Sequence, residues 1–224
     1  MSAQKQLSLR GGASIMPDTS RRPRKEPRQA RSLATVGVIL DATALVLVAE
    51  GYDQTTTNRI AERAGVSIGS LYQYFPNREA VVGALNNRTE AELSNAIWHA
   101  ISESESDGSS LREFVSFGLT TAVSQHARIL PLLQALMQAN AGQAPVRGAG
   151  VRSPHRQGIL RSVLDNRADE LRPDFDREAG SFFIPRMVGS ALDAAIAFRP
   201  DAFANGELAR ELTAMLSYYM TGGR

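Results

Sequence analysis

The stretch TTTNRIAERAGVSIGSLYQYFPNREAVV, residues 55–82, decides the fold of the first part of the chain. Two short helical segments meet in it at Gly65, a residue that can adopt the left-handed backbone of a tight turn. Thr55 or Thr56 can begin the first helix, because a threonine hydroxyl accepts a hydrogen bond from the unpaired amides of a first turn. Ser67 can begin the second helix in the same way. The stretch therefore predicts two helices joined by a short turn.

A turn at Gly65 sets the register of both helices. The apolar positions of that register are Ile60, Ala64, Val66 and Leu71, and the small Ala61 faces the second helix. A helix-turn-helix needs these three things: a small residue where the helices cross, a glycine in the turn, and apolar side chains beneath both helices. We therefore expect a helix-turn-helix.

The second helix, expected over about residues 68–75, is too short to be a core helix. At about 100° per residue, Leu71 points inward and Tyr74 and Phe75 fall on the inner half. The outer arc carries Gly69, Ser70, Tyr72 and Gln73, with Ile68 at its edge. Hydrogen-bonding groups, an apolar edge and a glycine that permits close approach suit the base edges and methyl groups of a DNA major groove. We interpret this segment as a recognition helix.

Residues around the recognition helix are candidates for contacts with DNA phosphates. They are Thr56, Thr57, Tyr72, Tyr74 and Arg78. Helix N-termini add partial positive charge at the same place. The alternative for each residue alone is structural: a threonine cap, a partly buried tyrosine, an ordinary surface arginine.

With AEGYD at residues 49–53, the quoted stretch resembles the DNA-binding domain of the TetR/AcrR family of transcriptional regulators. The resemblance covers roughly residues 28–85, and AGVS, GSLYQYF and the following proline carry it. It implies an all-helical homodimer with a larger C-terminal domain that binds a small effector, and repression as the commoner outcome. It assigns DNA contacts to Thr56, Thr57, Ser67, Ile68, Gly69, Ser70, Tyr72, Gln73, Tyr74 and Arg78. Arg78 stands where the family more often has lysine, and Thr43 replaces a small apolar residue.

The rest of the chain also predicts helices, so we expect an all-α protein. One helix is expected from Pro27 to Glu50, ending at Gly51, and another after Pro76 and Asn77. Further helical patterns cover residues 111–139, 155–171, 176–198 and 206–220, and the polar segment 102–110 suggests a linker. We expect a basic arm at residues 1–26, a DNA-binding domain at 27–80, and a domain for effector binding and dimerisation at 81–224.

Composition narrows the function further. The 224 residues include no cysteine, which excludes disulfides and thiolate metal sites. Residues 1–31 hold eight Lys or Arg against two Asp or Glu, a charge of +6 that leaves −4 for the remainder. A basic arm suggests a polyanion partner, and the alternative is a solvated tail. The sequence shows no signal peptide or membrane-spanning segment, so we expect a cytoplasmic protein.

No motif indicates catalysis. His99, His126 and His155 lack the spacing of metal ligands, and nucleotide-binding and hydrolase motifs are missing from the sequence. We therefore expect no enzyme activity, cofactor or metal. The competing hypothesis is an all-helical small-molecule carrier or enzyme without a DNA function.

The segment SFFIPRMVGSALDAAIAFRP, residues 181–200, is apolar nearly all round, more than one core face requires. We expect it to pair with the last helix and with both helices of a second copy as a four-helix dimer bundle. The expected interface residues are Val188, Ala191, Ala194, Ala195, Leu212, Met215 and Tyr219. The alternative is a fully buried core helix in a monomer.

Large soft side chains in the C-terminal part predict a pocket for an apolar, possibly aromatic, effector. The candidates are Trp98, Phe114, Phe117, His126, Leu133, Met137, Phe183 and Met187. Simple core packing is the alternative for any one of them.

Overall fold

The computed structural model describes residues 26–104, 109–140 and 154–223. The chain forms two units, Met1–Thr35 and Val36–Arg224, which are described separately. In the first unit, the start of helix α1 carries a hydrogen bond from the Thr35 hydroxyl to the Arg31 carbonyl, 2.9 Å long. The expected basic arm lies outside the described residues, apart from Glu26.

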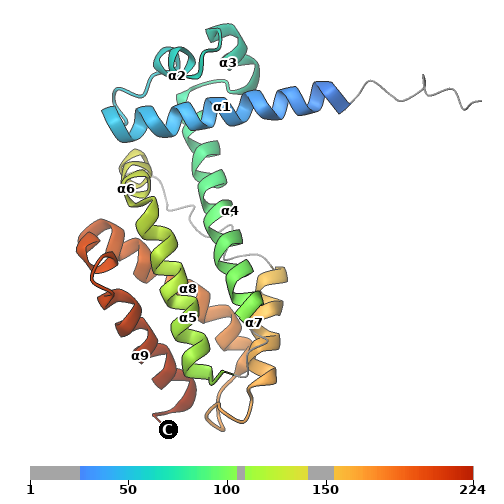
Figure 1. Cartoon of the computed structure of the whole chain (residues 1–224), viewed down its shortest axis with the longest axis vertical. Helices are drawn as coiled ribbons and strands as arrows, with labels where there is room; N and C mark the ends of the chain where they lie inside the picture. Colours follow the sequence, from blue (N-terminus) through green and yellow to red (C-terminus); the bar gives the residue numbers. More distant parts are fainter. Residues whose placement is uncertain (1–25, 105–108, 141–153, 224) are drawn as a thin grey trace, which may run out of the picture. The chain divides into compact units, whose positions relative to one another are not determined.

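Every regular element in the described part of the chain is a helix, which confirms the predicted all-α class (Figure 1). The helices are α1 Glu26–Glu50, α2 Thr57–Ala64, α3 Ile68–Tyr74, α4 Arg78–Ser104, α5 Leu111–Arg128, α6 Leu130–Ala139, α7 Pro154–Asn166, α8 Arg177–Phe198 and α9 Glu207–Thr221, with a 3₁₀ turn η2 at Pro200–Phe203. Within the second unit α5 packs against α4 and α9, and α7 packs against α8.

The predicted turn chemistry is confirmed in the helix-turn-helix. Gly51 ends α1 and Gly65 ends α2, both with left-handed backbone at φ +78° and +66°. The Thr56 hydroxyl accepts the Arg59 N–H at 3.3 Å, and the Ser67 hydroxyl accepts the Ser70 N–H at 3.0 Å. The ends of the helices in this motif are therefore determined by local capping interactions.

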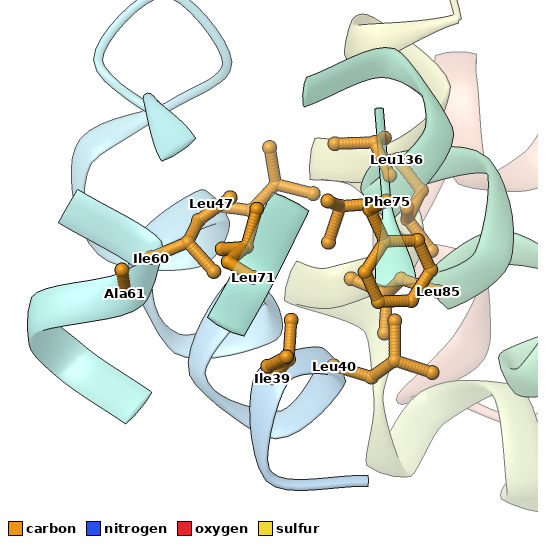
Figure 2. Packing of buried hydrophobic residues seen from close by; sticks show 11 residues of the cluster. Ile39, Leu40, Leu47, Ile60, Ala61, Leu71, Phe75, Leu85 and Leu136 are labelled. Atoms are coloured by element: carbon orange, nitrogen blue, oxygen red, sulfur yellow. The ribbon is translucent and has the colours of Figure 1, made fainter. Parts of the chain in front are cut away.

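A hydrophobic cluster beneath the helix-turn-helix joins it to the rest of the second unit. Its core includes Ile60, Ala61 and Leu71, as the register predicted. It also includes Leu136 from α6, a fully buried residue that the sequence did not point to. Figure 2 shows Leu136 beside Phe75. Leu136, 62 positions after the last residue of α3, thus completes the core under α2 and α3.

Thr43 lies fully buried in α1. Its hydroxyl donates to the Ile39 carbonyl, four residues earlier, at 2.7 Å. A buried polar group with a hydrogen-bond partner costs little, so threonine fits at a position where the sequence resemblance leads us to expect a small apolar residue.

The single helical pattern expected over 111–139 is two helices. α5 ends at Arg128 and α6 begins at Leu130, with Pro131 in its first turn. Proline lacks the N–H that a continuous helix donates and is favoured in a first turn, which accounts for a new helix beginning here. Pro185, in contrast, lies inside α8.

Two further clusters form the core of the C-terminal part, with Val188 of α8 packed against both. The distal cluster is Leu111, Leu119, Leu164, Leu171, Phe175, Ile184, Leu212, Leu216 and Met220. The proximal cluster is Ala122, Val123, Leu133, Leu192, Ala195, Ile196, Phe203 and Ala209.

Two described helices, Arg31–Glu50 and Arg177–Phe198, are long and apolar enough to cross a membrane by length and composition. Core helices of globular proteins pass the same test. Ile39, Leu40 and Leu47 of the first helix and Leu192 and Ile196 of the second lie in the hydrophobic clusters, as such core helices do.

We expect Gly180→Ala to destabilise the fold by about 1–3 kcal/mol. A Cβ at this position in α8 would lie 2.5 Å from Cζ of the buried Phe175 ring, which packs edge-on against Tyr219. The matched control is Gly83→Ala in α4, where an added Cβ meets nothing within 4 Å. Alanine there should be neutral or stabilise by up to about 1 kcal/mol. Urea denaturation measures both variants, and equal stabilities would contradict the steric argument.

Candidate DNA-binding surface and effector cavity

The outer face of α3 is exposed and uncharged, as the sequence predicted. Leu71 is fully buried, which turns the opposite side of the helix to solvent. Ile68 is 38% and Tyr72 51% exposed, Gly69 and Gln73 are exposed, and Ser70 is half-buried. The face thus presents an amide, hydroxyls and an apolar edge around a glycine, a set that can read base edges.

The polar groups at the margin of this face are ordered by hydrogen bonds. The Thr57 and Tyr72 hydroxyls lie 3.2 Å apart, linking the first residue of α2 to α3. The Ser67 and Ser70 hydroxyls lie 2.8 Å apart. Thr56 is exposed as well as being the cap of α2. Orienting hydroxyls in advance reduces the entropy lost when they bind a ligand.

Arg78 is held in place at the start of α4. Its guanidinium stacks over the Tyr52 ring at 4.1 Å, donates to the Tyr52 carbonyl at 3.3 Å and pairs with Glu79 at 3.2 Å. The pKa of the Glu79 carboxyl is lowered, chiefly by a hydrogen bond to its own backbone and further by Arg78. Arg78 is therefore a fixed positive charge. Tyr74 is partly buried against the cluster beneath.

The sequence reasoning missed Tyr52 as a partner of Arg78. The signal lay in the segment AEGYD, because the residue after a helix-ending glycine often packs back on the helix. Tyr52 belongs to the apolar cluster under the helix-turn-helix as well.

The C-terminal helices line a partly open cavity of about 510 Å³ in the second unit. Of the predicted effector residues, Trp98, Phe114, His126 and Leu133 line it. Phe117, Phe183 and Met187 are exposed instead, and Met137 packs against the proximal cluster. All four lie outside the cavity wall, because helical periodicity does not distinguish an inner apolar face from an outer one.

The remaining wall residues were not predicted to line a cavity, and one of them, Val188, was predicted to lie in the dimer interface. The apolar ones are Leu93, Ile97, Ile101, Leu111, Val115, Gly118, Leu119, Ala122, Leu160, Val163, Leu164, Ile184, Pro185, Val188, Gly189, Leu192, Leu216 and Met220. The polar ones are Glu90, Ser94, Arg186, Ser190 and Asp193. In α4 the spacing of Glu90, Leu93, Ser94, Ile97, Trp98 and Ile101 marks one helix face, which is the signal that could have identified this part of the wall.

The predicted interface residues fall into three groups. Ala194 and Met215 are exposed, and Val188, Ala191 and Tyr219 are half-buried. Ala195 and Leu212 are buried in the proximal and distal clusters of the single chain. Ala195 and Leu212 belong to the hydrophobic core of one chain, so most contacts in a dimer interface would have to come from exposed residues near them.

The described histidines have structural partners. His99 Nδ1 lies 3.2 Å from the Glu103 carboxylate, and His126 Nδ1 lies 2.7 Å from the Ala122 carbonyl. The His155 side chain lies outside the described residues. In the described ranges, no three His, Cys, Asp or Glu residues come together as a metal site.

The helix-turn-helix segment of the chain is similar to known proteins. Residues 39–85 match the family described as bacterial regulatory proteins, tetR family. The chain is 47% identical over 47 residues to the uncharacterized HTH-type transcriptional regulator YvkB of Bacillus subtilis, covering 21% of this chain and 25% of that protein. It is 32% identical over 91 residues to the A-factor receptor protein of Streptomyces griseus, covering 41% and 30%. The matches thus span under a third of these relatives.

Solved structures extend the similarity to the fold of the C-terminal part. FadR from Bacillus subtilis, in complex with stearoyl-CoA, matches with a TM-score of 0.57 at 18% identity, over 84% of this chain and 98% of that one. A TetR-family transcriptional regulator from Streptomyces coelicolor matches with a TM-score of 0.54 at 23% identity, over 83% and 96%.

Fold and site together define an all-helical protein with an N-terminal helix-turn-helix. The family match covers that motif, and the solved structures have the same fold beyond it. The helix-turn-helix segment, residues 39–85, matches the TetR family, as the resemblance of its sequence indicated.

Proposed function

We propose that the protein is a DNA-binding transcriptional regulator that binds a two-fold symmetric operator as a homodimer. The observation that carries the proposal is the exposed, uncharged face of α3 over the buried Leu71. Each copy lays α3 in a major groove, where Ile68, Tyr72 and Gln73 meet base edges. Thr57 and the fixed charge of Arg78 contact the phosphates. Residues 27–80 form the DNA-binding domain, and the protein acts in the cytoplasm.

Residues 81–224 bind the effector and form the dimer. An effector held in the cavity favours one arrangement of the two recognition helices of the dimer. It therefore changes the affinity of the dimer for DNA, and bound DNA changes the affinity for the effector by the same factor. The regulator acts as a repressor released by its effector. The relative KstR of Mycolicibacterium smegmatis, 42% identical over 53 residues, is described as a transcriptional repressor, which supports repression.

The proposed dimer interface consists of apolar residues of α8 and α9 that are exposed in the single chain. Phe183, Met187, Ala194 and Phe198 recur along α8 at spacings of four, seven and four, so they share one stripe. Met215 and Tyr218 are exposed on the neighbouring α9. A contiguous exposed apolar surface is typical of an interface. A protein that recognises a two-fold symmetric DNA site with one recognition helix per half-site requires two copies of the chain.

Selection of bound duplexes from a random DNA pool, using the purified full chain, tests the proposal. We expect one enriched, two-fold symmetric sequence and a protected footprint on both half-sites. A pool that stays random after repeated selection would contradict DNA recognition and favour the carrier or enzyme hypothesis.

We also propose that the basic arm raises affinity for DNA without changing sequence choice, since its arginines meet mainly phosphates. Deleting residues 1–25, which keeps α1 whole, should flatten the salt dependence of binding. Each lost phosphate contact should reduce the log–log slope by about 0.9. Salt-titrated binding to the selected operator and to a scrambled duplex measures this, and the ratio of the two affinities should stay constant. An unchanged slope would make the arm a passive tail.

A further inference from the structure

The polar side chains on the outer face of α3 differ in whether their groups are already engaged. The Ser70 hydroxyl lies 2.8 Å from the hydroxyl of Ser67. The Tyr72 hydroxyl lies 3.2 Å from the hydroxyl of Thr57. The side-chain amide of Gln73 is exposed and makes no hydrogen bond within the part of the chain that the structure describes. Both its NH₂ group and its carbonyl oxygen are therefore available to a partner.

Gly69 allows the Gln73 amide to come close to a base pair. The two residues are four positions apart, so they lie one turn from each other on the same stripe of the helix. Gly69 is exposed and has no side chain to hold the helix backbone away from a groove. A glutamine side chain on this stripe can therefore reach the edge of a base.

Ile68 supplies the apolar part of the same face. It is the first residue of α3, and its side chain is 38% exposed. From Ile68 to Gln73 the helix rises about 7.5 Å, which corresponds to roughly two base-pair steps of about 3.4 Å each. The two side chains therefore meet bases within about three consecutive pairs.

The side chains that most often recognise guanine are missing from α3. An arginine or lysine paired with O6 and N7 of guanine is the commonest specific base contact. The described helix Ile68–Tyr74 contains neither residue. Arg59 and Arg63 belong to α2, the helix that crosses the phosphate backbone in this motif, and Arg59 is paired with Glu50 at 3.2 Å. Base contacts are thus left to an amide and an apolar side chain.

We propose that each half-site of the operator has a core of A·T pairs, which Gln73 and Ile68 select. The Gln73 amide donates to N7 of one adenine and accepts from its N6 amino group, a pairing that only adenine offers in the major groove. Ile68 packs against the C5-methyl group of a thymine within two base pairs of that adenine. The inference rests on the proposed function and adds which bases the recognition helix selects.

Selection from a random duplex pool, carried out in parallel with the wild type and with Gln73→Arg, tests the adenine contact. The wild type should enrich one adenine at the same position of both half-sites. Gln73→Arg should enrich guanine at that position and leave the other positions unchanged, because a guanidinium donates two hydrogen bonds to O6 and N7. The preference between the two operators should invert, with a change of about tenfold or more for each half-site.

Gln138→Arg is the matched control for this experiment. Gln138 is also exposed but lies on α6, so the variant gains the same charge away from α3. It should select the wild-type operator. Circular dichroism measures whether both variants keep the helical content of the wild type.

Replacing the core thymine of the operator by uracil tests the Ile68 contact with the unchanged protein. Uracil lacks only the C5-methyl group, so the hydrogen bonds of the base pair stay the same. Wild-type binding should weaken about fourfold for each half-site, the value of one buried methyl group. Ile68→Ala should bind the thymine and uracil operators equally well.

Three results would each overturn the proposal and leave the proposed function unaffected. They are selected half-sites that contain only G·C pairs, an unchanged selection by folded Gln73→Arg, and equal wild-type binding of the thymine and uracil operators. A wild-type pool that stays random would instead contradict the proposed function, and the base preference would fall with it.

Discussion

Gly69→Trp is expected to abolish specific binding to the selected operator and to leave the fold intact. A Cβ at Gly69 meets only the Ser67 hydroxyl oxygen, at 3.9 Å, so the chain itself has room for a side chain. An indole there would hold α3 away from the base edges. Affinity should fall to the level of a scrambled duplex, a loss of about 10³-fold or more. Fluorescence anisotropy with labelled operator measures it, and circular dichroism measures the helical content.

Gly158→Trp is the matched control for this experiment. Gly158 is exposed on α7, and an added Cβ there meets nothing within 4 Å. It should bind operator as the wild type does. Tyr72→Ala removes a side chain from the same α3 face and should also lose specific binding. If Gly69→Trp and Tyr72→Ala both kept wild-type affinity, α3 would not be the recognition helix.

Met215→Glu is expected to convert the proposed dimer to monomers. Met215 is 64% exposed on α9, so glutamate costs the isolated chain little. In a symmetric interface the new charge is buried twice and repels its own copy, a cost of several kcal/mol per ion. Sedimentation velocity at micromolar concentration should show half the wild-type mass. Operator affinity should fall with it, because each monomer contacts only one half-site.

Leu45→Glu provides the comparison, since Leu45 is also more than half exposed but lies on α1. It should remain dimeric. Leu212→Glu is unsuitable for this purpose, because Leu212 is buried in the distal cluster and a charge there would disrupt the fold. A monomeric wild type, or a dimer that tolerates Met215→Glu, would show that the partner surface lies elsewhere.

The helix-turn-helix could be predicted almost residue by residue because local chemistry determines it. Capping hydroxyls, a left-handed glycine and one apolar register each act within a few residues. The observed caps Thr56 and Ser67 and the buried Ile60 and Leu71 follow from these rules.

In the C-terminal part the sequence predicts the helices, but it does not predict which face of each helix lies in the core, in the cavity wall or in solvent. α8 carries apolar residues on several sides, so periodicity does not tell which side faces the core, the cavity or solvent. The apolar pattern alone predicts Ala195 and Leu212 in a dimer interface and Phe183 and Met187 in the cavity, whereas the structure buries the first two in the core and exposes the other two. Only long-range packing decides among these faces. The break before Pro131, in contrast, had a local signal that the apolar pattern concealed.

The burial of Leu136 beneath the recognition motif has a consequence for modular engineering. Hybrid regulators are built by joining the first 80 or so residues of one protein to the remainder of another. In this chain, such a graft separates Leu71 and Phe75 from Leu85 of α4 and Leu136 of α6, which belong to the same hydrophobic cluster. The transplantable unit is discontinuous in sequence, and a hybrid that keeps its native packing must carry a matching residue at position 136.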